Sequence, residues 1–118
     1  MSNAETVLRG WAQEEGLDPS SIRFEGYADL GRYTLGRCRY MPVGSPYRCG
    51  IGMATFWAIE RKGWLWRSVL WHEFCHAWAY LEDDSPNGHD AHWRELRGKR
   101  KAYVVGDLVA TLLGPRAR

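Results

Sequence analysis

The sequence predicts an α+β fold with an N-terminal helix, a small three-stranded sheet and then a set of helices. Three observations support this prediction. Apolar residues recur at helical spacing in residues 4–15 and again in three stretches after residue 63. Between residues 22 and 59, apolar and polar residues alternate as they do in strands. Because the strands are followed by helices and do not alternate with them, the order is that of an α+β domain.

Residues 4–15 are predicted to form a short amphipathic helix. Its apolar stripe consists of Val7, Leu8, Trp11 and Ala12. Gly16 suits the end of this helix, because glycine adopts the left-handed conformation that often follows a helix. A turn at residues 18–21 then leads to the first strand.

Three strands are predicted, over residues 22–27, 33–40 and 49–59. Each alternates with a period of two residues, which places every second side chain on the same face of a sheet. In the third strand, Gly50 and Gly52 indicate a bulge or a close approach of another group to the backbone.

The C-terminal half is predicted to be helical. The first helix covers residues 64–81, and the breaker-rich segment 83–88 ends it. Two further helices follow, at about 91–100 and 103–113. Gly114-Pro115 is expected to end the last of them.

Length and composition indicate one soluble domain over residues 1–118. A chain of 118 residues builds one core and is too short for two. Most of the seven tryptophans are expected in that core. Three cysteines give no disulfide framework, and no signal peptide or membrane-spanning run is visible, so a cytoplasmic protein without membrane contact is expected.

Basic residues are concentrated near the C-terminus. Residues 1–93 carry 9 Lys and Arg against 12 Asp and Glu, whereas residues 94–118 carry 7 against 2. The basic 94–101 stretch is therefore a candidate for binding nucleic acid or an acidic partner. The alternative is a solvated helix end at which cations are favourable.

The most informative motif is His-Glu-x-x-His, formed by His72, Glu73 and His76 in the helix predicted at 64–81. Two histidines four residues apart fall on one face of a helix and can share a metal ion. Zn²⁺ is the expected ion, and Glu73 is placed to accept a proton from a metal-bound water. This combination indicates a zinc-dependent peptidase.

A catalytic zinc usually has three protein ligands, so a third is needed besides the two histidines of the motif. Four residues are candidates. His89 and His92 follow the helix, and Glu95 lies 19 residues beyond His76. Glu82 also has a suitable spacing, but the class of peptidase that uses it needs a glycine where this chain has Ala79.

Several segments resemble the SprT-like metallopeptidase domain. The active-site motif at 72–78 is followed by Gly-His-Asp-Ala-His-Trp at 88–93, which is similar to the family's downstream Gly-His-Gly-x-x-aromatic segment. Upstream, residues 35–40 resemble the family's strand with a Gly-x-Cys core, and residues 49–53 resemble the strand before the active-site helix. The resemblance covers about residues 22–100.

This resemblance implies a zincin-like fold with His89 as the third zinc ligand. Asp90 departs from the glycine that usually follows this histidine, and His92 stands where an acidic residue is common. His92 and Glu95 therefore remain alternative ligands or contacts around the ligands. The family's relatives include proteases that act on DNA-associated proteins, so the implied partners are a protein or peptide substrate and nucleic acid.

Two functions follow from these expectations. The first is peptide hydrolysis by a zinc-activated water, with an extended peptide paired to the strand at about 51–59. The alternative is a non-catalytic zinc-binding module, or a DNA- or protein-binding regulator that keeps the fold. A structural zinc normally has four protein ligands, which His72, His76, His89 and His92 could supply.

Overall fold

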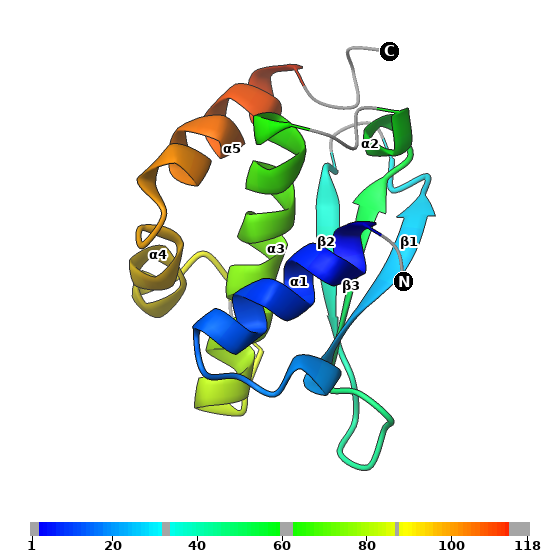
Figure 1. The fold of residues 1–118 in the computed structure, drawn as a ribbon, viewed down its shortest axis with the longest axis vertical. Helices are drawn as coiled ribbons and strands as arrows, with labels where there is room; N and C mark the ends of the chain where they lie inside the picture. The colour runs from blue at the N-terminus through cyan, green and yellow to red at the C-terminus, as the bar shows by residue number, and fades with distance from the viewer. Residues whose placement is uncertain (1–2, 32–33, 60–62, 87, 114–118) are drawn as a thin grey trace.

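The computed structural model describes residues 3–31, 34–59, 63–86 and 88–113, and shows a layer of helices packed on one side of a small sheet (Figure 1). The long helix α3 runs through the middle, with α1 crossing in front of it and α4 and α5 on its far side from the sheet. The elements are α1 (Asn3–Glu14), β1 (Ile22–Ala28), β2 (Gly36–Tyr40), β3 (Cys49–Ala54), α2 (Phe56–Ile59), α3 (Trp64–Asp83), α4 (Ala91–Arg97) and α5 (Lys101–Leu113), with a short 3-10 turn at Pro19–Ser21. The predicted α+β fold is confirmed.

The sheet has the order β1-β3-β2, with β3 parallel to β1 and antiparallel to β2. The prediction that the third strand offers an edge for a substrate peptide is therefore wrong, because β3 is hydrogen-bonded on both sides. The predicted length of this strand is also wrong. Pairing with β1 ends at Ala28 and Ala54, and the chain then turns into the helix Phe56–Ile59. The outer strand of the sheet that packs against α3 is β2.

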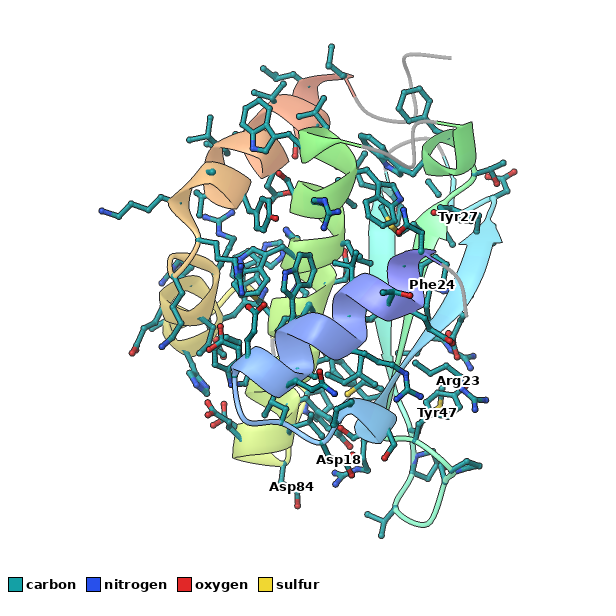
Figure 2. The ribbon with its side chains drawn as sticks, in the orientation of Figure 1. Asp18, Arg23, Phe24, Tyr27, Tyr47 and Asp84 are labelled. Atoms are coloured by element: carbon teal, nitrogen blue, oxygen red, sulfur yellow. The ribbon has the colours of Figure 1, made fainter. Side chains whose placement is uncertain are left out.

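The two glycines of β3 make room for side chains of the neighbouring strands. A Cβ at Gly50 would lie 2.3 Å from the carboxylate of Glu25, at a point where the register of β1 shifts. Arg39 donates two hydrogen bonds of 3.0 Å to this carboxylate, and Tyr47 donates one of 2.9 Å. Arg23 and Tyr47 lie next to each other beside β1 (Figure 2). The guanidinium of Arg23 is 4.9 Å from the ring centre of Tyr47. The close approach predicted for these glycines is found, and the bulge lies in β1.

Aromatic residues fill the core around α3. Six of the seven tryptophans are buried, and only Trp64 is substantially exposed. Trp11 of α1 contacts both Trp71 and Phe74 of α3, with ring centres 5.1 and 5.6 Å apart. This packing fixes α3 between α1, the sheet and α5, and buries residues on every side of the helix.

The predicted helices are present with small changes at their ends. Helix α3 extends to Asp83, where Asp84 adopts the left-handed conformation with a φ of 55°. Helix α4 is shorter than predicted, because Gly98 ends it. Tyr33, in the second predicted strand, and Gly114-Pro115 lie outside the described residues. Over the described part of the chain, no helix has the length and apolar character needed to cross a membrane.

Candidate metal centre

Helix α3 brings His72, Glu73 and His76 to the face that looks toward β2 and α5. The two imidazole rings are one turn apart, with centres separated by 5.1 Å. His76 and Glu73 are buried, and the Glu73 carboxylate lies 4.0 Å from His72 Nε2. The helix therefore presents two imidazoles and one carboxylate to the same small volume.

His89 joins these residues from the loop between α3 and α4. Asp90 caps the N-terminus of α4 by accepting a hydrogen bond of 2.9 Å from the backbone N–H of Trp93. This cap fixes the turn in which His89 lies. In this position, Nε2 of His89 is 3.2 Å from Nε2 of His72. One ring nitrogen from each of His72, His76 and His89 lies within 4.8 Å of the others.

The other candidate ligands lie elsewhere. His92 is on the first turn of α4, where Nδ1 is 2.7 Å from Asp83 Oδ2 and Nε2 is 2.8 Å from Glu82 Oε1. Both ring nitrogens are thus occupied by carboxylates at the end of α3. Glu95 is exposed on α4 and is not part of the histidine group.

Trp93 supports all three histidine rings, a role that its place in the sequence motif does not reveal. Its ring stacks on His76 and His89 at centre distances of 5.0 and 4.3 Å, with interplanar angles of 17° and 21°. It meets His72 edge-on at 4.7 Å, and its Nε1 donates a hydrogen bond of 3.2 Å to the His72 carbonyl. The aromatic residue of the motif therefore holds the three imidazoles as one unit.

The histidine group opens into a pocket of about 340 Å³ between β2, α3 and α5. Besides the three histidines and Glu73, the pocket is lined by Thr34, Leu35, Gly36, Val69, Asp107 and Thr111. Gly36, at the start of β2, passes so close to α3 that a Cβ there would lie 3.1 Å from Glu73 Cγ. The pocket therefore lies beside β2, one of the two outer strands of the sheet.

Burial and neighbouring charges shift the pKa values of the site. Burial raises the pKa of Glu73 to about 7, although the positive charge of His72 opposes this shift. Burial lowers the pKa of His72, but a hydrogen bond to Asp107 and the charge of Glu73 outweigh it, so the net shift is upward. Burial and the charge of His72 lower the pKa of His89. A carboxyl that titrates near neutral pH is suited to both accepting and releasing a proton.

The residues present fit a zinc ion. Zinc binds imidazole nitrogen at about 2.0–2.1 Å, so two nitrogens bound to one tetrahedral ion lie about 3.3 Å apart. The observed distance between the Nε2 atoms of His72 and His89 is 3.2 Å. Three neutral nitrogen ligands also leave a fourth position for water or substrate, as catalytic zinc sites require.

Comparison with known families gives one match. Residues 11–107 match the model of the SprT-like family, which is most of the chain. No curated protein and no solved structure matches the chain.

Proposed function

Because this chain belongs to the SprT-like family, we propose that it is a zinc-dependent metallopeptidase in which His72, His76 and His89 hold the metal. The observation that supports this proposal best is the convergence of three imidazole nitrogens next to a buried carboxylate, Glu73. Ionisable groups with perturbed pKa values, such as Glu73, cluster in the clefts of functional sites. The match of residues 11–107 also confirms the resemblance drawn from the sequence motifs.

In this proposal Glu73 is the general base and then the general acid. Bound zinc would supply the Lewis acidity that polarises the scissile carbonyl and activates a water. Glu73 accepts the proton of the attacking water and returns it to the leaving amine, for which a pKa of about 7 is suitable. Gly36 has no side chain, so it leaves room beside this carboxylate that a Cβ would take up.

The substrate is proposed to be an extended peptide segment that pairs with β2. Within the part of the chain that the structure describes, this strand pairs with β3 alone and is an outer strand of the sheet, and residues 34–36 at its start line the pocket. Addition of a strand to a free sheet edge is a common mode of peptide recognition. Main-chain pairing along Gly36–Tyr40 would carry the peptide past Glu73.

A nucleic-acid partner for the basic 94–101 stretch remains a weaker proposal. Arg97 forms an ion pair with Asp107, and Arg100 forms ion pairs with the two glutamates at residues 14 and 15, where α1 ends. Both guanidinium groups contact tryptophan rings. Lys99 lies 5.4 Å from the ring centre of Trp78. Much of this basic charge thus has a structural use, and DNA binding would depend mainly on the exposed Arg94 and Lys101.

The alternative of a closed structural zinc site has less support. It needs His92 as a fourth ligand, but both ring nitrogens of His92 are hydrogen-bonded to carboxylates of α3. A group of three histidines without His92 supports the proposal of an open, catalytic site, because such sites have three protein ligands.

Two measurements on matched variants test the proposed function. Elemental analysis should find one zinc per wild-type chain, lost in His89→Ala and kept in His92→Ala. A peptidase assay should show activity in the wild type and in Glu95→Gln, but not in Glu73→Gln, which should still contain zinc. Activity that survives Glu73→Gln would rule out the proposed base, and a zinc-free wild type would rule out the proposed metal centre.

A further inference from the structure

We propose that Asp107 is a positioning residue for the metal centre: its carboxylate, held by Arg97, fixes the tautomer and orientation of His72. This inference rests on the proposed zinc site and adds to it two residues from α4 and α5. The sequence motifs contain neither of them.

The contact between Asp107 and His72 involves a different ring nitrogen of His72 from the one that faces His89. Asp107 Oδ2 lies 2.6 Å from His72 Nδ1, whereas Nε2 of the same ring faces His89 at 3.2 Å. A carboxylate can only accept a hydrogen bond, so a neutral His72 carries its proton on Nδ1. The lone pair of Nε2 is then directed to the metal position.

Arg97 fixes the carboxylate in this position. Its Nη1 lies 3.2 Å from the same Asp107 Oδ2, and its guanidinium stacks over the Trp93 ring at 4.7 Å. The backbone carbonyl of Arg97 accepts a hydrogen bond of 3.0 Å from Trp71 Nε1. Arg97 therefore connects Asp107 with the ring that supports all three histidines.

The packing of α5 on α3 sets the distance between Asp107 and His72. Gly106 lies so close to Ser68 that a Cβ at residue 106 would fall 2.0 Å from Ser68 Oγ. Trp64 Nε1 donates a hydrogen bond of 2.7 Å to the carbonyl of Ala102, which holds the start of α5. The helices are thus in close contact one residue before Asp107, and little freedom remains for its carboxylate.

Asp107 could instead serve only as the buried partner of Arg97 that stabilises the fold. The two roles differ in what happens to His72. A purely structural Asp107 leaves the tautomer and the metal affinity unchanged as long as the variant folds. A positioning Asp107 changes both, because carboxylates that hold a ligating histidine typically contribute about 10- to 100-fold to metal affinity.

The test compares Asp107→Asn, Asp107→Ala and a control, Asp84→Asn. Asp84 is exposed, follows α3, pairs with Arg48, and belongs neither to the group of His72, His76 and His89 nor to the lining of the pocket. Zinc affinity is measured by competition with a chelator, and the His72 tautomer by NMR of the ring nitrogens in the metal-free protein. We expect zinc binding about 10- to 100-fold weaker in Asp107→Ala, weakened less in Asp107→Asn, and unchanged in Asp84→Asn. His72 should carry its proton on Nδ1 in the wild type and be a mixture of tautomers in Asp107→Ala.

The outcomes separate this inference from the proposed function. If the wild type binds no zinc, the proposed metal centre itself is wrong. If the wild type binds zinc and both Asp107 variants bind it within twofold of wild type, the positioning role is overturned. If Asp107→Ala does not fold, the zinc affinity and the His72 tautomer are measured instead in the isosteric variant Asp107→Asn and in Arg97→Gln. Wild-type zinc affinity and tautomer in both of these would equally overturn the inference.

Discussion

Replacing Glu73 with glutamine should stabilise the metal-free protein, by an amount that grows with pH. Glu73 is buried, and its pKa is raised from an ordinary 4.5 to about 7. Between these two values the folded state holds a proton that the unfolded state has released. Stability therefore falls as the pH rises through this window. Glutamine has the shape of the protonated side chain and does not ionise, so the variant avoids this loss.

The magnitude follows from the size of the shift. At about 1.4 kcal/mol per pH unit, raising the pKa from 4.5 to about 7 costs about 3 kcal/mol once the carboxyl is ionised in both states. The variant and the wild type should have similar stability near pH 4.5, and the variant should be more stable by up to about 3 kcal/mol above pH 7. For a domain of this size that is a large fraction of the total free energy of unfolding.

Urea unfolding in the presence of a chelator measures this difference. The seven tryptophans give a fluorescence signal, and the experiment is repeated from about pH 5 to about pH 8. Glu95→Gln is the control, because it makes the same chemical change at an exposed position of α4 outside the pocket. The reasoning would be refuted if the difference in free energy of unfolding between Glu73→Gln and wild type did not change with pH. It would also be refuted if the wild type were the more stable protein at high pH. Added zinc should reduce the difference, because a nearby dication favours the carboxylate.

Three further predictions concern the surroundings of the site. Gly36→Ala would place a Cβ 3.1 Å from Glu73 Cγ, so we expect peptidase activity to fall by about tenfold or more while circular dichroism shows an intact fold. Gly106→Ala would overlap Ser68 and separate α5 from α3, so urea unfolding should show a loss of about 1–3 kcal/mol. The pKa of His92 is raised by hydrogen bonds to two carboxylates of α3, so its contribution to stability is present below its ordinary pKa and is lost as the pH rises through the raised value. The melting temperature of wild type should therefore fall relative to His92→Gln over that range, and parallel pH profiles of the two proteins would contradict this.

Most of the helices and strands could be predicted because their signals are local. The stripe in residues 4–15 and the turn after it define α1, and the breaker-rich 83–88 segment defines the end of α3. The order of the strands could not be predicted, since it depends on pairing between β1 and β3, which are separated by the 20 residues between Ala28 and Cys49. For the same reason, the alternation in residues 49–59 did not reveal that β3 ends at Ala54, where its pairing with β1 ends at Ala28.

The choice between His89 and His92 also depends on more than spacing. Both follow α3 within a few residues of each other, and either could reach back to the motif. Asp90 decides between them, because its cap makes α4 begin between the two histidines. His89 is left in the loop beside His72, and His92 turns to the end of α3. The family motif usually has glycine at this position, so the cap made by Asp90 is a feature of this chain that gives the physical reason for the places of His89 and His92.

Asp107 was missed because it lies 35 residues from His72 and belongs to no motif. One signal could have found it. It is the only acidic residue in the apolar segment 103–113, where a carboxylate on a buried face needs a partner. The structure supplies two partners, His72 and Arg97, and both lie at the metal centre.

The buried polar residues of this small domain lie mostly at the proposed site and lower its stability. Four are buried in the described part of the chain, namely Ser68, Glu73, His76 and Asp107. Three of them line the pocket, and burying such groups lowers stability unless they are paired. The surrounding tryptophans offset this cost by burying a large apolar area, and Trp93 and Trp71 also contact the site or its support directly. If zinc binds the folded chain alone, it adds stability in proportion to its affinity. Removal of the metal should then destabilise the wild type more than Asp107→Ala, in which the proposed site is already weakened.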